Sequence, residues 1–217
     1  MDFALARQNM IDGQVRPNGV IEGKLVEVME QVPRELFVPA NRRSVAYIDE
    51  DLPLGSNRYL PEPVVTGRLV QALKIAPSDV VLEIGAGTGY TTAILSKLAA
   101  TVVAVESDEA LSARAQETLA ELDIDNVVMV NRDYTQGYAD QAPYDAILIN
   151  GSVAECPENI VSQLAEDGRL VCVVRDERSM GRITLMQRVR GVTSEIELYD
   201  AGTPMLPGFE PAAAFEF

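Results

Sequence analysis

A glycine-rich stretch in the first half of the chain constrains the fold more than any other part of the sequence. Residues 80–84 (Val-Val-Leu-Glu-Ile) are almost all apolar, as expected of a buried parallel strand. Gly85, Gly87 and Gly89 follow at once, and residues 91–98 then return to apolar positions at helical spacing. Glycine lets the backbone turn tightly, and ligands of open α/β sheets bind between a strand's carboxyl end and the next helix. The stretch predicts a ligand site, although tight packing of a strand on a helix would need the same glycines.

Strands and helices alternate after residue 79, which indicates a parallel sheet with crossover helices. We expect strands at residues 79–84, 101–106, 126–131, 144–150 and 169–175, and helices at 89–99, 108–122 (with Ser107 as N-cap) and 157–166. An antiparallel hairpin of residues 182–190 and 194–200, joined by 191–193, would finish the sheet, and residues 213–217 could add one more strand.

The residues before this pattern look helical and irregular. An amphipathic helix ends at Pro33, and Pro63 opens another helix in which apolar residues recur at three- and four-residue spacing. We therefore divide the chain into a helical cap and substrate-side segment over residues 1–75 and a ligand-binding sheet domain over residues 76–217.

The composition excludes several classes of function. The chain of 217 residues has no histidine, which removes histidine-dependent metal sites and catalytic triads, so we expect no metal. Cys156 and Cys172 are too few for a disulfide framework and are expected as reduced thiols. The formal charge of −15 repels phosphate backbones, so we expect no nucleic-acid partner. A local cluster of Arg34, Arg42 and Arg43 could still seat an anionic substrate.

The sequence also bears on location. No apolar run approaches the roughly 18 residues that span a bilayer, and residues 1–4 (Met-Asp-Phe-Ala) lack the regions of a signal peptide. We therefore expect a cytoplasmic protein with no membrane partner.

A carboxylate at the end of the second predicted strand indicates a nucleoside ligand. Glu106 follows the glycines by about 20 residues, where a carboxylate can accept hydrogen bonds from the hydroxyls of a ribose. A dinucleotide such as NAD or FAD asks for Gly-x-Gly-x-x-Gly/Ala, but Tyr90 stands at the last position of that pattern. Its bulk would obstruct the pyrophosphate, which favours a different nucleoside.

The spacing Glu-x-Gly-x-Gly-x-Gly-Tyr over residues 83–90 resembles that of S-adenosylmethionine-dependent methyltransferases. The resemblance implies S-adenosyl-L-methionine as cofactor: the glycines would approach its methionine part, Glu106 would hold its ribose, and Glu83 would organise the loop or meet its ammonium group. Asp133 would lie near the adenine amine, unless it is an ordinary loop acid, and Tyr134 would pack on the ring. The residues expected at the cofactor are Leu60, Glu83, Gly85, Gly87, Thr88, Gly89, Tyr90, Glu106, Ser107, Asp133, Tyr134 and Asn150.

Segments on both sides of the glycines narrow the resemblance to one family. Residues 32–39 (Val-Pro-Arg-Glu-Leu-Phe-Val-Pro), 46–49, 52–55 and 63, and later 126–127, 137, 142–147 and 163–171, are similar to protein-L-isoaspartate O-methyltransferases. This implies an α/β fold of the Rossmann-like class I methyltransferase type: a mostly parallel seven-stranded sheet with helices on both faces, plus a helical N-terminal extension. It also implies methyl transfer to isoaspartyl carboxylates of damaged proteins or peptides. Such a carboxylate is already ionised at neutral pH, so the reaction needs positioning rather than a general base.

A departure from the family leaves the acceptor open. The family carries a serine in an Ile-Ser-x-Pro motif before the glycines, and Pro61 stands at that position. Proline has no hydroxyl and no N–H, so we assign no catalytic residue and name Tyr59 as the nearest candidate. Asn150 is followed by Gly-Ser rather than by the Pro-Pro-Tyr of methyltransferases that act on the amino groups of adenine or glutamine, so those substrates lose support. Three functions stay open: isoaspartyl repair, methylation of another carboxylate, and a degenerate cofactor-binding protein that acts as a sensor or interaction partner.

Overall fold

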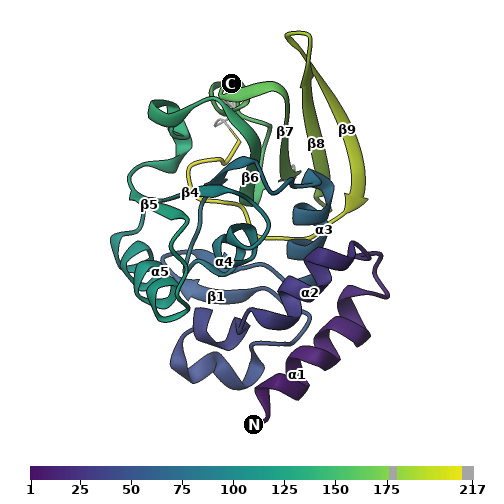
Figure 1. The fold of residues 1–217 in the computed structure, drawn as a ribbon, viewed down its shortest axis with the longest axis vertical. Helices are drawn as coiled ribbons and strands as arrows, with labels where there is room; N and C mark the ends of the chain where they lie inside the picture. The colour runs from purple at the N-terminus through teal and green to yellow at the C-terminus, as the bar shows by residue number, and fades with distance from the viewer. Residues whose placement is uncertain (176–179, 212–217) are drawn as a thin grey trace, which may run out of the picture.

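The predicted sheet is present in the computed structural model, which describes residues 1–175 and 180–211 (Figure 1). Its seven strands lie in the order β5-β4-β3-β6-β7-β8-β9. They are β3 (Val80–Ile84), β4 (Thr101–Glu106), β5 (Val127–Asn131), β6 (Tyr144–Val153), β7 (Leu164–Val174), β8 (Arg182–Val189) and β9 (Val192–Asp200). The strands β3 to β7 are parallel and the last two are antiparallel, which confirms the predicted fold class. The strand expected at 213–217 lies outside the described residues.

The two faces of the sheet are covered in different ways, because successive residues of a strand point to opposite sides. One face packs against α3 (Pro63–Leu73), α4 (Tyr90–Ser96), α5 (Glu109–Glu121) and the N-terminal segment. The other face packs against α6 (Glu158–Val161), short 3₁₀ turns and the segment after β9. Leu206 and Phe209 of that segment belong to the buried cluster on this second face.

The N-terminal part contains a β-hairpin that the sequence analysis did not predict. The two expected helices are α2 (Gly23–Gln31) and α3, and they are preceded by α1 (Phe3–Met10) with a π-helical turn (Ile11–Val15), which was not predicted individually. Two 3₁₀ turns over Arg34–Phe37 and Ala40–Val45 lie between α2 and the hairpin. In the hairpin, β1 (Leu52–Gly55) and β2 (Arg58–Leu60) pair antiparallel. The boundary near residue 75 stays a prediction.

Three local predictions were wrong. The helix expected over 157–166 is only the short α6, because Leu164 pairs with Tyr144 and so draws the following residues into β7. The N-cap of α5 is Asp108 rather than Ser107, since the Asp108 carboxylate accepts from Leu111 N at 2.9 Å. The turn between β8 and β9 spans residues 190–191 rather than 191–193, and both of its residues have positive φ.

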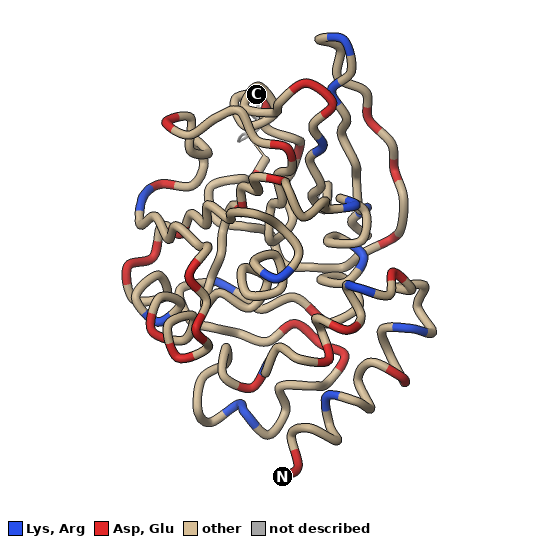
Figure 2. The backbone as a smooth tube through the Cα atoms, in the orientation of Figure 1, with Lys and Arg blue, Asp and Glu red and all other residues tan. Residues whose placement is uncertain are grey.

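Acidic positions are spread over the backbone rather than gathered at one end (Figure 2). Within the described residues, no helix is long and apolar enough to cross a membrane.

Candidate functional site

The glycine loop joins the carboxyl end of β3 to α4, where the strand order reverses. β3 lies between β4 and β6, so connections run to opposite sides of it and leave a crevice beyond its end. Gly85, Gly87 and Gly89 have φ values of +77°, +58° and +91°. Residues with a Cβ atom disfavour positive φ, so the loop favours glycine at all three positions.

Glu83, the fourth residue of β3, is fully buried at the base of this loop. Its carboxylate accepts from Thr92 Oγ1 at 2.5 Å and from Asn150 Nδ2 at 3.0 Å. Burial raises the pKa of Glu83 to about 8, and the nearby charge of Glu106 adds to the rise. The side chain is therefore largely protonated at neutral pH, and Thr92, which the sequence analysis did not single out, is one of its two partners.

Asn150 brings β6 into the site as predicted. Besides the bond to Glu83, its Nδ2 donates to Thr91 Oγ1 at 3.2 Å. Its Oδ1 is buried and has no hydrogen-bond partner in the described part of the chain. A buried acceptor without a partner is costly, so this oxygen is suited to a donor from a ligand.

Glu106 ends β4 next to the glycine loop, and both of its oxygens are engaged. Oε2 accepts from Gly87 N at 2.7 Å, and Oε1 accepts from Asp108 N at 3.0 Å. Arg58 Nη1 donates to both oxygens at 2.6 Å. The carboxylate is thus placed where the sequence predicts it, but a cation of the same chain is bound to it.

Arg58 is the residue that the sequence analysis missed. It begins β2, and the turn before it places Ser56 and Asn57 at positive φ, so the hairpin points Arg58 at the glycine loop. Its side chain is only 4% exposed and also donates from Nη2 to Gly85 O at 2.8 Å. The turn residues could have suggested a hairpin, but no local signal connects Arg58 with Glu106.

The residues expected around adenine lie beside Glu106, and their contacts are within the chain. The Tyr134 backbone N–H donates to Ser107 Oγ at 3.1 Å, and the Asp133 carboxylate accepts from Thr135 N at 2.9 Å. The Tyr134 ring lies under the Arg58 guanidinium, with 5.2 Å from Cζ to the ring centroid. It also stacks on Phe209 at 6.0 Å between centroids.

Two further predicted cofactor residues, Thr88 and Tyr90, face the N-terminal segment, and a third, Leu60, belongs to it. Thr88 Oγ1 donates to Phe37 O at 2.5 Å, and Leu60 is buried. Tyr90 is fully buried with its ring edge-on to Phe37, 5.6 Å between centroids. The side chains of Thr88 and Tyr90 hold the glycine loop against the segment before it, to which Leu60 itself belongs.

A buried arginine, Arg34, holds the segment that contains Pro61. Arg34 donates from Nε to Ala46 O and from Nη2 to Pro61 O, both at 2.7 Å, and its burial lowers the pKa of the guanidinium. The sequence suggested that Arg34 could seat an anionic substrate, but the side chain is fully buried and not available to one, whereas Arg42 and Arg43 are exposed. Pro61 is buried and Tyr59 is 37% exposed, so of the two only the tyrosine presents a hydroxyl to solvent.

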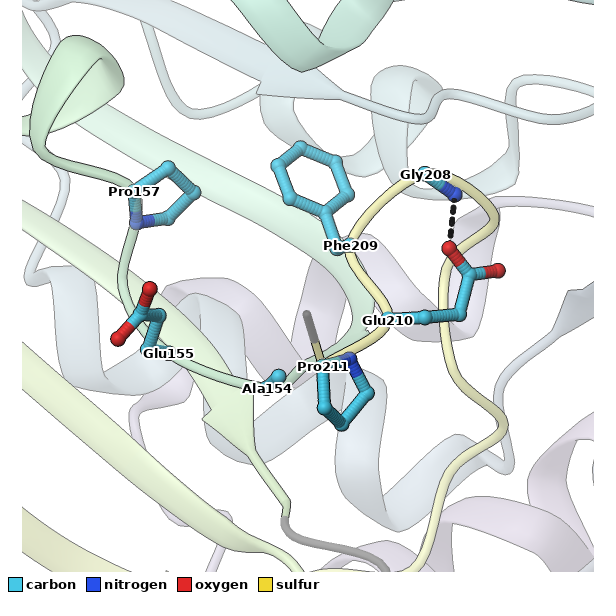
Figure 3. A pocket seen from close by; sticks show the side chains of 7 residues that line it. All are labelled: Ala154, Glu155, Pro157, Gly208, Phe209, Glu210 and Pro211. Atoms are coloured by element: carbon cyan, nitrogen blue, oxygen red, sulfur yellow. Dashed lines mark hydrogen bonds between the residues drawn. The ribbon is translucent and has the colours of Figure 1, made fainter. Parts of the chain in front are cut away.

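The cavities at this site are small. One of about 270 Å³ opens beside Glu106 and is lined by Ser56, Arg58, Glu106, Ser107, Asp108, Tyr134 and Pro207. A second, of about 10 Å³, lies at Asn150 between the hairpin and the segment after β9. A larger cavity of about 440 Å³ lies between residues 154–157 and 208–211 (Figure 3), and none of its lining residues belongs to the predicted site.

Comparison with known proteins gives one family. A family model for protein-L-isoaspartate (D-aspartate) O-methyltransferase matches residues 6–198. The chain is 42% identical over 197 residues to a protein-L-isoaspartate O-methyltransferase of Roseiflexus castenholzii, covering 91% of this chain and 89% of the relative. It is 38% identical over 182 residues to the Methanoculleus marisnigri protein of the same name, covering 84% and 83%.

Solved structures agree on the fold. A protein-L-isoaspartate O-methyltransferase structure superposes with a TM-score of 0.80 at 24% identity, covering 94% of this chain and 67% of that one. A Plasmodium falciparum structure described as the same enzyme type in complex with S-adenosyl-L-homocysteine has a TM-score of 0.77 at 21% identity, covering 92% and 97%. Because the family model spans residues 6–198 and the relatives are about 40% identical over most of both chains, the chain belongs to the protein-L-isoaspartate (D-aspartate) O-methyltransferase family.

Proposed function

We propose that this protein transfers the methyl group of S-adenosyl-L-methionine to the carboxylate of isoaspartyl residues in proteins or peptides. The observation that carries the proposal is family membership over residues 6–198 together with Glu106 beside the glycine loop. The acceptor is therefore a protein or peptide carboxylate, and a cytoplasmic location belongs to the proposal.

The residues around the loop suit this cofactor. The positive φ of Gly85 and Gly87 lets a ligand approach the backbone, and Glu106 offers two carboxylate oxygens to ribose hydroxyls. The partnerless Asn150 Oδ1 offers a buried acceptor to an ammonium group. These residues would hold the cofactor once Arg58 has left Glu106.

The chemistry follows from the charge of the acceptor. The bound cofactor supplies an electrophilic methyl group on its sulfonium. An isoaspartyl carboxylate has a reference pKa near 4 and needs no base, so the protein's part is to bind, orient and desolvate. Pro61 stands at the family's serine position, and Tyr59, two residues before it in the hairpin, is the nearest residue with a hydroxyl.

Binding of S-adenosyl-L-homocysteine tests the cofactor. We expect calorimetry to detect binding to the unmodified protein, and Glu106→Gln to weaken it roughly 10- to 100-fold, since a charged hydrogen bond to ribose contributes about 1.5–3 kcal/mol. Glu109→Gln, at the start of the neighbouring α5, is the matched control and should bind normally. No binding in any form would exclude the cofactor.

Methyl transfer to an isoaspartyl peptide, measured against its aspartyl twin with labelled S-adenosylmethionine, tests the acceptor. Transfer to the isoaspartyl peptide alone supports the proposal. Pro61→Ser restores the hydroxyl of the family, so we expect it to raise the rate, whereas Pro53→Ser in β1 should not. Equal labelling of both peptides would indicate another carboxylate substrate.

A second candidate is a cofactor-binding protein that has lost catalysis. Pro61 at the family's serine position favours it, because the side chain there is buried and has no polar group. Binding of S-adenosyl-L-homocysteine without methyl transfer, together with activity gained in Pro61→Ser, would establish this function instead.

A further inference from the structure

The nucleoside site of this protein is already filled by its own side chains. A carboxylate has about four acceptor positions. Those of Glu106 are taken by Arg58 Nη1 on both oxygens, Gly87 N and Asp108 N. A ribose hydroxyl therefore has no position left on Glu106 unless Arg58 moves away.

The segment after β9, residues 201–211, fills the adjoining space; we call it the tail. Leu206 carbons lie 3.0 and 3.1 Å from the point where a Cβ on Gly85 would sit, and Leu206 Cβ lies 3.1 Å from the same point on Gly151. Leu206 therefore occupies the space that the missing side chains of Gly85, in the glycine loop, and Gly151, in β6, leave open.

The tail is fastened at several points. Leu206 N donates to Ser152 O at 2.8 Å, and Ser152 N donates to Pro204 O at 3.1 Å, so the tail pairs with the end of β6. Farther along, Ala154 N donates to Phe209 O at 3.0 Å, and Figure 3 shows the tail turning at Gly208. These bonds make the tail a built part of the fold.

Tyr134 connects the tail with Arg58. Its hydroxyl donates to Pro207 O at 2.9 Å, and its ring contacts both the Arg58 guanidinium and Phe209. The aromatic face expected to pack on adenine is therefore used for internal contacts. The two cavities at the site have volumes of about 270 and 10 Å³, which are below the roughly 300–1,000 Å³ typical of ligand pockets.

We propose that Arg58 and the tail residues Leu206 and Phe209 act as an internal ligand of the nucleoside site, and that the cofactor binds only in exchange for them. The inference rests on the proposed cofactor. Leu206 and Phe209 lie beyond residue 198, where the match to the family model ends, whereas Arg58 lies within the matched residues. Apparent affinity is then reduced by the fraction of molecules in which the site is open.

A tryptophan reporter tests the exchange without an activity measurement. The chain contains no tryptophan, so Phe209→Trp gives a single emitter at a position that is 9% exposed. We expect S-adenosyl-L-homocysteine to shift its emission to longer wavelength as the tail leaves. Phe3→Trp in α1 is the control and should not respond. Saturated binding with an unchanged Phe209→Trp spectrum would overturn the proposal.

Affinity measurements separate this inference from the proposed function. We expect Arg58→Met and Leu206→Ala each to tighten S-adenosyl-L-homocysteine binding at least tenfold, and Leu198→Ala in β9 to leave it unchanged. Weaker or equal binding in both site variants, with methyl transfer intact, would overturn the inference and keep the function. Tighter binding by the two site variants, without methyl transfer by the unmodified protein, would support the inference and overturn the proposed function. Absence of binding in every form would overturn both.

Discussion

Glu83 on β3 and Asn150 on β6 join two neighbouring parallel strands at the base of the site, with 3.0 Å between Glu83 Oε1 and Asn150 Nδ2. The bond is buried, and the amide oxygen Oδ1 of Asn150 has no hydrogen-bond partner among the described residues. The pair therefore links the two strands and leaves a buried acceptor, Asn150 Oδ1, beside the glycine loop.

Glu83 should make stability depend on pH. Its folded-state pKa of about 8 lies above the ordinary value of 4.5, so the folded protein holds more protons between these limits. The free energy of unfolding should therefore fall as the pH rises toward 8, by at most about 1.4 kcal/mol per pH unit. Urea unfolding at several pH values measures this slope.

Glu83→Gln, which cannot titrate, should flatten that slope. Glu62, whose pKa burial raises to about 7, contributes in both proteins, so the difference between them isolates Glu83. The control is Glu117→Gln, because the Glu117 side chain is exposed on the surface of α5. Equal slopes in Glu83→Gln and the unmodified protein would contradict the assignment.

The ion pair between Arg58 and Glu106 should show strong energetic coupling. Both side chains are at most 4% exposed, so Glu106→Gln leaves a buried guanidinium without its counter-charge and should cost roughly 3–5 kcal/mol. The double variant Arg58→Met/Glu106→Gln removes both charges and should be more stable than Glu106→Gln alone. A double-mutant cycle by urea unfolding measures the coupling, and simple additivity would contradict it.

Gly137 should tolerate no side chain while Gln163 is present. Its φ is +65°, and a Cβ there would lie 2.9 Å from Gln163 Cδ, whose amide donates to Gln136 O at 2.8 Å. Gly137→Ala should cost at least about 2 kcal/mol, and less in a Gln163→Ala background, where only backbone strain remains. Gly13→Ala meets nothing within 4 Å and is the control. The same cost in both backgrounds would show that the contact is unimportant.

The turn between β8 and β9 offers a stabilising substitution. Arg190 has φ +53° and is followed by Gly191 at +73°, a combination that favours Asn-Gly in two-residue hairpins. Arg190→Asn should raise the unfolding free energy by about 0.5–1 kcal/mol, because asparagine adopts this region at lower cost. Ser194→Asn, in the extended β9, should give no gain. Thermal unfolding distinguishes the two, and a loss in Arg190→Asn would contradict the argument.

The sequence alone determined the sheet, the glycine loop and the position of Glu106, because apolar periodicity and glycine conformation are local properties. The strand expected at 101–106 matches β4, and the glycine loop has positive φ at all three glycines. Tertiary structure decided the rest. Arg58 reaches Glu106 from 48 residues away, and Leu206 reaches Gly85 from the far end of the chain. Leu164 joins the sheet in place of a helix because Tyr144 pairs with it. Contacts between distant segments leave no periodic signal, so only the folded chain shows that Arg58 binds the Glu106 carboxylate, which the sequence predicts as a ribose ligand.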